Sequence, residues 1–150
     1  MTRQSDLNSF YRILTDLERR VGGRRVLRDC TGRSGWPQRG VYLFFEENEL
    51  RADSTTPRVV RVGTHAVSVG SRATLWNRLH AHRGHGDGGG NHRGSIFRLR
   101  LGQCLLSRKE YSSGITNAWG QGSTAPKAMR LAEVALEKHV SEYIGRMPFL

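Results

Sequence analysis

An arginine and a histidine in the middle of the chain stand at a spacing that would bring them together on a helix. Arg78 and His82 are four residues apart within residues 75–82, and side chains at this spacing project from one face of a helix. A guanidinium offers a planar fork of donors that fits phosphate oxygens, and an imidazole titrates near neutral pH. These residue types suit chemistry on a phosphate group. The simpler interpretation of His82 is that it is an exposed histidine at the end of a helix.

The charge of the whole chain points to the same kind of partner. Lys and Arg total 24 against 13 Asp and Glu, which gives a formal net charge of +11, and all but three of the basic residues are Arg. An Arg-rich, strongly basic domain indicates a polyanionic partner such as a nucleic acid. A codon bias toward Arg would explain the ratio of Arg to Lys but not the net excess of positive charge.

Length and composition exclude several classes of protein. A chain of 150 residues with 37% hydrophobic and 25% charged residues suits one globular domain with one core. The longest apolar run, Val41–Phe45, is far shorter than the roughly 20 residues of a membrane-spanning helix, and residues 1–6 lack the apolar core of a secretory signal. We therefore expect a cytoplasmic protein with no membrane partner. Cys30 and Cys104 show no disulfide framework or zinc spacing, and Cys104 is expected in the core.

Hydrophobic periodicity predicts the elements that must position these side chains. A helix over about residues 6–21, capped by Ser5, comes first, and an Arg- and Gly-rich loop over residues 24–39 follows. Two apolar, β-branched segments then predict strands that pair as an antiparallel hairpin with a long loop. The strands are expected at 40–45 and 59–64, further helices at 72–83 (capped by Ser71 and closed by Gly84) and 126–145, and the start of another strand at 147–150. Residues 95–108 fit the helix and strand patterns almost equally, and a helix is favoured there.

Three short motifs follow one another on a strand, a strand and a helix. They are Gly40-Val41-Tyr42, Arg61-Val62-Gly63 and the helix that carries Arg78. This order over residues 40–83 resembles the GIY-YIG nuclease family, in which a GIY-type and a YIG-type tripeptide precede a helix with an Arg. The resemblance implies an α+β fold, with a small antiparallel sheet flanked by helices and an extra N-terminal helix. We expect residues 1–39 to form the N-terminal helix and basic loop, and residues 40–150 the GIY-YIG-like nuclease domain.

The resemblance also implies a function and roles for individual residues. In the family, the Tyr of the first motif lies near the attacking water and the helical Arg stabilises the phosphate, so Tyr42 is the candidate base and Arg78 the candidate phosphate clamp. Some restriction enzymes of the family carry a His one turn after the Arg, which makes His82 a candidate proton carrier. A phenol, with a pKa of about 10, acts as a base only where cations favour its phenolate. The implied activity is metal-dependent endonucleolytic cleavage of DNA.

The chain departs from the family pattern at the second motif and at the metal ligand. Arg61 stands where the second motif has Tyr; its cation could contact phosphate or favour the phenolate of Tyr42, or it is only a solvent-facing strand residue. The family holds a divalent metal, Mg²⁺ or Mn²⁺, with a Glu on the helix after the third core strand. If residues 147–150 begin that strand, we expect the chain to be truncated before this helix, and the metal ligands stay unassigned. Glu133 and Glu137 are the substitutes within the chain, but they are interpreted first as solvated ion-pairing residues.

The Gly-rich stretch 84–94 offers candidate contacts to a nucleic-acid backbone. These are Arg83, His92 and Arg93, and the competing interpretation of the stretch is a plain linker. A zinc site from the clustered histidines is a weaker hypothesis, because their spacing matches no known zinc pattern and no Cys joins them. Those histidines are His80, His82, His85 and His92.

Two hypotheses compete with an active nuclease. One is a catalytically inactive nucleic-acid-binding module that lacks the metal-binding Glu, and the other is a protein-binding domain whose charge is incidental. The literal second motif Tyr143-Ile144-Gly145 does not decide between them. It ends a predicted helix with no Arg-bearing helix after it, and Gly145 is expected to stop that helix.

Overall fold

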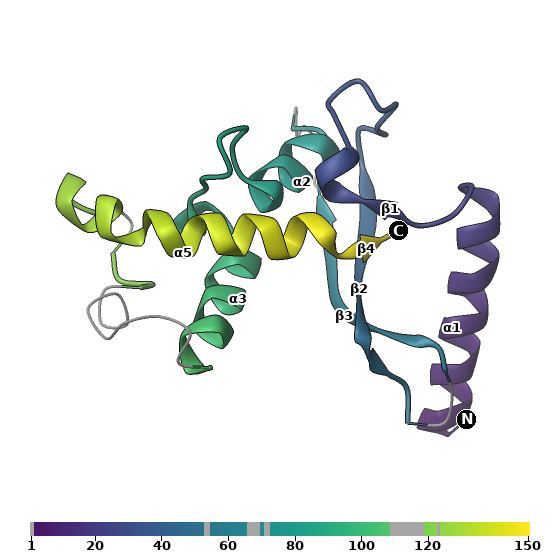
Figure 1. Cartoon of the computed structure of the whole chain (residues 1–150). Coiled ribbons are helices and arrows are strands. Elements are labelled where there is room, and N and C mark those ends of the chain that lie inside the picture. The colour runs from purple at the N-terminus through teal and green to yellow at the C-terminus, as the bar shows by residue number, and fades with distance from the viewer. Residues whose placement is uncertain (1, 53–54, 66–69, 71–72, 109–118, 123) are drawn as a thin grey trace.

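The computed structural model describes residues 2–52, 55–65, 70, 73–108, 119–122 and 124–150. Over these residues the chain forms a four-stranded antiparallel sheet with helices on both sides, which confirms the predicted α+β fold (Figure 1). The helices are α1 (Arg3–Arg20), α2 (Leu75–Arg83), α3 (Ile96–Ser107) and α5 (Lys127–Arg146), with the short 3₁₀ helices η1 (Leu27–Asp29) and η2 (His92–Gly94). The strands are β1 (Arg25–Val26), β2 (Gly40–Leu50), β3 (Pro57–His65) and β4 (Pro148–Phe149).

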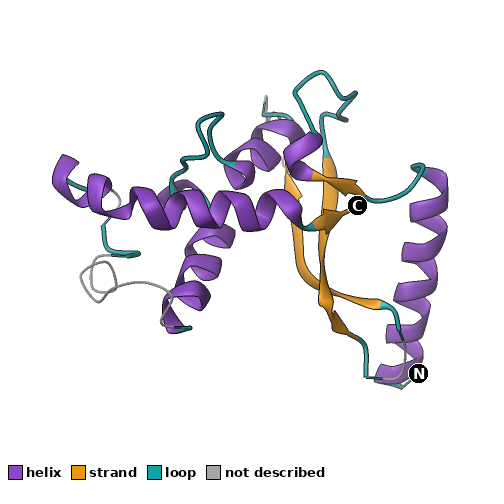
Figure 2. Cartoon of the chain, viewed as in Figure 1, coloured by secondary structure: helices purple, strands orange, loops and turns teal. Residues whose placement is uncertain are grey.

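The sheet has the strand order β1-β4-β2-β3, and the long β2–β3 hairpin is its main part (Figure 2). In this hairpin Tyr42 lies opposite Gly63 and Phe44 lies opposite Arg61, which confirms the predicted antiparallel pairing. On its other side β2 pairs with β4 at Phe44 and Phe149. The last strand thus brings the C-terminal end of α5 against the middle of β2.

Alternate residues of β2 are buried on opposite faces of the sheet, as the two-residue period of a strand requires. Tyr42 and Phe44 belong to the larger core, together with apolar residues of α2, α3 and α5. Leu43 and Phe45 belong to a smaller core with Tyr11 and other residues of α1. The sheet lies between α1 and the remaining helices (Figure 1), so the phenol of Tyr42 points away from α1 and toward α2.

The helix that carries Arg78 begins later than the sequence predicts. Its N-cap is Thr74, whose side chain accepts a hydrogen bond from the N–H of Asn77 while the Asn77 side chain accepts one from the N–H of Thr74. This reciprocal capping box sets the helix start, and the predicted cap, Ser71, lies outside the described residues. Gly84 ends the helix as predicted, with a φ of 87° that favours glycine.

Three other sequence-based predictions were wrong. Thr2 caps α1 by accepting from the N–H of Ser5, so Ser5 lies inside the helix and is not its cap. Gly145 does not stop α5, which continues one residue further; it is buried, and a Cβ there would lie 3.4 Å from the Cβ of Arg28. Cys104 is exposed on α3 and is not a core residue.

The remaining elements agree with the sequence in part. The segment over 95–108 is a helix, as predicted, with Ser95 as its N-cap. The predicted loop over 24–39 contains β1 and η1, and most of the predicted connection over 110–125 lies outside the described residues. In the part of the chain that the structure describes, no helix has both the length and the apolar character needed to cross a membrane.

Phe44→Ala tests the placement of the larger core. We expect it to lower the free energy of unfolding by about 3–5 kcal/mol, because the ring is 0% exposed and contacts the rings of Phe97 and Phe149 at centroid distances of 5.0 and 5.4 Å. Urea unfolding measures this. Val62→Ala on β3, where the side chain is 50% exposed, is the control and should cost less than about 1 kcal/mol. Equal losses in the two variants would contradict this core.

Candidate active site

A chain of buried hydrogen bonds joins the sheet to two helices. Tyr42 Oη lies 2.8 Å from Nε2 of His82, and Nδ1 of the same ring lies 2.7 Å from Oγ of Ser95. The three residues are 1%, 0% and 1% exposed, which excludes the interpretation of His82 as an exposed histidine. A neutral imidazole donates through one nitrogen and accepts through the other, so protons are ordered along this chain in one of two directions.

A glycine in the neighbouring strand makes room for the phenol. Tyr42 is paired with Gly63 across the hairpin, and a Cβ on Gly63 would collide with the Cζ and Oη atoms of Tyr42. The ring therefore lies directly over the backbone of β3 on its way to α2. The glycine of the second motif is required for this close approach of the ring, and not for an unusual backbone angle.

The charges around His82 are positive. Burial, followed by the positive charges of Arg78 and Arg61, lowers the pKa of His82 to about 3, and Arg98 and His65 act in the same direction. The imidazole is therefore neutral near neutral pH. In this state the ring links Tyr42 to Ser95 as a hydrogen-bonding group, and its role as a proton carrier stays a prediction. The same cations favour an anion bound beside the ring.

The two arginines reach this centre from different elements. Arg78, on α2, is partly exposed and donates from Nη1 to the carbonyl oxygen of Gly94 at 3.3 Å. Arg61, on β3, is also partly exposed, and its guanidinium carbon lies 6.0 Å from the ring centroid of Phe97. The structure thus brings together the four residues that the sequence singles out as catalytic candidates: Tyr42, Arg61, Arg78 and His82.

A second buried network of hydrogen bonds contacts the backbone carbonyl of His82. Arg98, which is 0% exposed, donates from Nη1 to the carbonyl oxygen of His82 at 2.9 Å and from Nε to Glu137 at 3.1 Å. The other carboxylate oxygen of Glu137 accepts from Nδ1 of His92 at 2.9 Å, and Nε2 of that ring accepts from the N–H of Gly120. Burial raises the pKa of Glu137, but the hydrogen bonds from His92 and Arg98 outweigh it and hold that pKa below its usual range.

Sequence reasoning missed the residues that hold the imidazole. Ser95 is visible in the sequence only as a helix cap, and Arg98 only as one of many arginines. One feature of the sequence indicates the cap: Ser95 and Arg98 have the spacing by which an N-cap hydroxyl accepts from the third helical N–H. In the structure that hydrogen bond, from Arg98 N–H to Ser95 Oγ, measures 3.2 Å. Nothing in the sequence indicates that the same hydroxyl also bonds His82.

Comparison with known proteins agrees with this geometry. A family model described as a GIY-YIG domain matches the chain over residues 1–150. The chain belongs to the GIY-YIG domain family. No curated protein and no solved structure gives a significant match. The family match extends beyond residues 40–83, which carry the motifs, and it includes α1. GIY-YIG domains typically occur in endonucleases, act on nucleic acid and generally use divalent metal ions.

The described residues of this GIY-YIG domain do not fit a divalent metal at the Tyr42–His82 pair. They contain no group of three or more His, Cys, Asp or Glu side chains able to hold a metal, and the charged groups that act on His82 are all cations. The two candidate glutamates of α5 are engaged elsewhere, since Glu137 binds Arg98 and Glu133 binds Arg93. Both glutamates are buried, at 2% for Glu133 and 5% for Glu137, so the interpretation of them as solvated residues is wrong.

The candidates for backbone contacts occupy different environments in the domain. Arg93 is paired with Glu133 through both terminal nitrogens, at 2.7 and 2.8 Å, and its side chain is only 8% exposed. His92 is 2% exposed and stacks on Trp119, with ring centroids 3.8 Å apart. Both therefore stabilise the packing of η2 against α5 and are not placed on an open loop. Arg83 is partly exposed and donates to the carbonyl oxygen of Arg28 at 3.3 Å.

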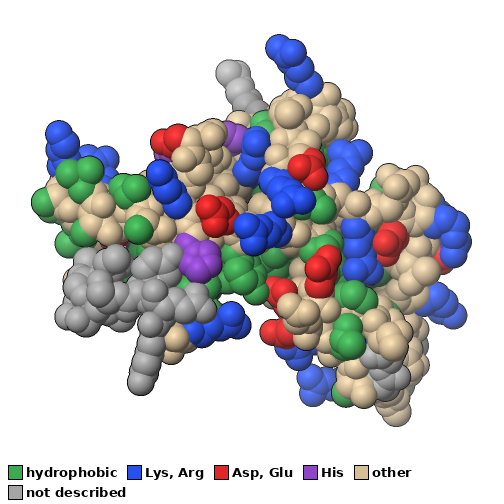
Figure 3. Space-filling model, in the orientation of Figure 1, with side chains coloured by type: hydrophobic (Ala, Val, Ile, Leu, Met, Phe, Trp, Pro, Cys, Tyr) green, Lys and Arg blue, Asp and Glu red, His purple; other side chains and the backbone are tan. Residues whose placement is uncertain are grey.

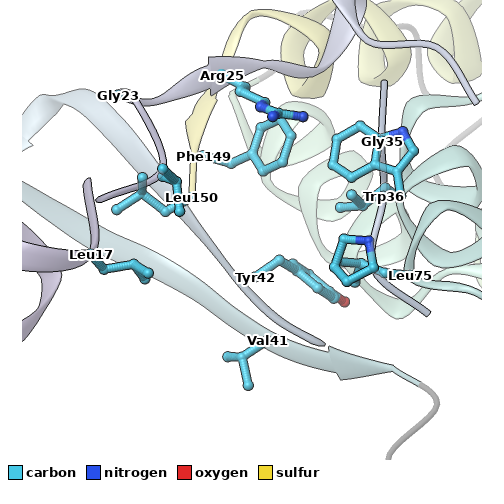
Figure 4. Close-up of a pocket in the computed structure, with 13 residues that line it drawn as sticks. Leu17, Gly23, Arg25, Gly35, Trp36, Val41, Tyr42, Leu75, Phe149 and Leu150 are labelled. Atoms are coloured by element: carbon cyan, nitrogen blue, oxygen red, sulfur yellow. The ribbon is translucent and has the colours of Figure 1, made fainter. Parts of the chain in front are cut away.

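An apolar cavity borders the other edge of the phenol. It has a volume of about 190 Å³ and is lined by side chains that include Trp36, Leu75 and Phe149 (Figure 4). Figure 4 shows that the ring of Tyr42 forms part of its wall. Neither Arg61 nor Arg78 lines this cavity, so it is separate from the cationic side of the phenol, where an anion would bind.

Gly63→Ala tests the close approach of Tyr42 to β3. We expect it to lower the free energy of unfolding by about 1–3 kcal/mol, because the added methyl group overlaps the ring. In a Tyr42→Ala background the same substitution should cost much less, because the overlapping atoms are gone. Urea unfolding of the two single variants and the double variant measures this coupling. The same cost in both backgrounds would contradict the contact.

The buried neutral state of His82 predicts a dependence of stability on pH. The pKa is about 3 in the folded chain and 6.5 without the protein environment, so below about pH 6.5 the unfolded chain binds a proton that the folded chain does not. His82 should therefore cost about 2 kcal/mol of stability between about pH 6.5 and about pH 5. Urea unfolding should show a smaller loss in His82→Gln. The control His80→Gln, at an exposed position, should keep the wild-type pH dependence; equal slopes in the two variants would refute the assignment.

Proposed function

We propose that this GIY-YIG domain is an endonuclease that hydrolyses phosphodiester bonds of DNA. The observation that carries the proposal is the 2.8 Å hydrogen bond between Tyr42 Oη and His82 Nε2. The positive charges of Arg61 and Arg78 act on the same His82 ring. Hydrolysis needs a group that takes a proton from the attacking water and cations that stabilise charge at phosphorus. The phenol of Tyr42 can take the proton, and the guanidinium groups of Arg61 and Arg78 can stabilise the charge at phosphorus.

Tyr42 is proposed to take the proton. Water attacks phosphorus through its oxygen, its proton passes to the phenolate oxygen of Tyr42, and the bond from phosphorus to the leaving oxygen breaks. The leaving oxygen takes a proton from solvent. A neutral His82 that accepts from Ser95 and donates from Nε2 to Tyr42 Oη supports the phenolate in this step, because hydrogen bonds to a charged form favour it.

Arg78 and Arg61 are proposed to bind the phosphate. Both are partly exposed and lie on different elements, so they can contact different oxygens of one phosphate group. A guanidinium donates to phosphate through paired N–H groups. Charge that builds on the oxygens during attack is then stabilised by groups that are already in place.

DNA is the proposed partner because of the charge of the whole domain. The net charge is +11, and the face drawn in Figure 3 shows Lys and Arg side chains over several elements, with fewer Asp and Glu among them. A duplex carries a dense row of phosphates, so a basic surface contributes binding that weakens as salt rises. The oligomeric state of the domain does not enter this proposal.

A specific observation favours a second candidate, a nucleic-acid-binding module without activity. Tyr42 and His82 are 1% and 0% exposed, so a substrate reaches the phenol only after neighbouring side chains move. The described residues also hold no cluster of metal ligands, whereas nucleases of the family generally use a divalent metal. Dependence on Mg²⁺ or Mn²⁺ distinguishes the two candidates.

The test is nicking of supercoiled plasmid DNA with Mg²⁺, with Mn²⁺ and with a chelator. We expect nicking with a divalent metal, and a loss of at least about 100-fold in Tyr42→Phe and in Arg78→Ala. Tyr42→Phe removes only the hydroxyl, so it preserves the packing over Gly63. The matched control is Arg100→Ala, which removes an exposed arginine of α3 that donates to Gln103 and should leave the rate unchanged.

The same assay separates the alternatives. Salt-sensitive binding of DNA without nicking in any metal would replace the nuclease by the binding module. No retardation of DNA even at low salt would exclude both and leave a protein-binding domain. Nicking that persists unchanged in Tyr42→Phe would place the reaction elsewhere on the molecule.

A further inference from the structure

Three alternating residues of β3 lie beside the phenol of Tyr42. In a strand, residues two apart share a face and are separated by about 7 Å. The missing Cβ of Gly63 would point into the Tyr42 ring, so this is the face toward which Arg61 and His65 also project. The ring therefore occupies the gap above Gly63, with Arg61 on one side of it along the strand and His65 on the other.

The two flanking side chains each carry a nitrogen without a partner. Arg61 Nε and His65 Nε2 are covered by surrounding atoms and have no hydrogen-bond partner among the described residues. Buried donors are normally paired, and leaving one unpaired costs about 1–3 kcal/mol. Two such nitrogens on one strand face, on either side of one hydroxyl, indicate a ligand that offers acceptor atoms to this face in the functional state.

A buried nitrogen of Arg93 has a different setting. Arg93 also leaves Nε unpaired, but its terminal nitrogens hold Glu133, so its charge is already balanced. Among the described residues, no carboxylate forms an ion pair with Arg61. Arg61 and His65 both lie close enough to His82 to act on its ring, as Arg78 does, so the three side chains surround one centre.

We propose that His65 is a phosphate-binding residue of this site. Its Nε2–H donates to an oxygen of the DNA phosphate backbone on one side of the Tyr42 ring, and the Nε–H of Arg61 donates to a different one on the other side. The side chains of Arg61 and His65 are both partly exposed, so they can turn to meet a phosphate that enters from solvent. The inference rests on the proposed function, because it takes a DNA phosphate as the ligand. His65 lies outside the motifs and follows the second motif by two residues.

The experiment measures binding of a fluorescently labelled DNA duplex by anisotropy, at fixed salt and with a chelator that prevents cleavage. We expect His65→Ala to weaken binding about tenfold, as for the loss of one hydrogen bond to a charged group. His65→Gln retains an N–H donor near the position of Nε2 and should recover part of the loss. The matched control is His80→Ala, an exposed histidine of α2, which should bind within about twofold of the wild type.

A second measurement keeps the test informative if His65→Ala does not fold. In the wild-type chain, the ¹⁵N resonance of His65 Nε2 should shift on titration with the unlabelled duplex, while that of His80 should shift less. An unshifted His65 during saturable binding would overturn the proposal, and so would wild-type affinity in a folded His65→Ala variant.

The outcomes also separate this inference from the nuclease proposal. Weakened binding in His65→Ala, with no plasmid nicking by the wild-type chain, would support the phosphate contact and refute the nuclease. Nicking by the wild-type chain, with unchanged binding and nicking in His65→Ala, would refute the contact and leave the nuclease in place.

Discussion

The close approach of Tyr42 to the backbone of Gly63 is the constraint on which the rest of the site depends. A side chain at position 63 would occupy the space of the ring, so only glycine lets the phenol cross β3 and reach α2. The 2.8 Å hydrogen bond to His82 then ties the hairpin to the helix that carries Arg78. Strand register, the start of α2 and the position of the candidate site are therefore parts of one arrangement.

Buried ionic pairing determines what is left at the centre of that arrangement. Desolvating a charge inside a protein costs several kcal/mol unless it is paired, and Glu137 balances Arg98 while Glu133 balances Arg93. This pairing removes the acids of α5 from the surroundings of His82. The groups that remain there are cationic, so the centre suits an anionic ligand and keeps the imidazole neutral. The ion pairs that stabilise the fold thus also set the charge of this centre.

Local features of the sequence were enough for most of the elements. The spacing of apolar residues predicted α1 and α5, and apolar, β-branched segments bounded by turn residues predicted the β2–β3 hairpin. For α3 the apolar positions fit a helix and a strand almost equally. The errors fall where neighbouring residues compete for one role. Thr74 and Ser71 are both good helix caps, and only the partner Asn77 makes Thr74 the cap. Similarly, a Gly near a predicted helix end suggests that the helix stops there. Gly145 instead lies inside α5, where Arg28 packs closely against it.

By itself, the sequence determined the family and the residue types of the site, because the order of the short motifs is visible without knowing which residues are in contact. Tyr42, Arg61, Arg78 and His82 follow from that order. Only the tertiary structure decided which of these side chains are buried, which nitrogens are paired, and that His65 faces the same centre. Burial and pairing depend on residues about 40 to 100 positions apart in the chain, and their free energy appears only when the fold removes water from both partners.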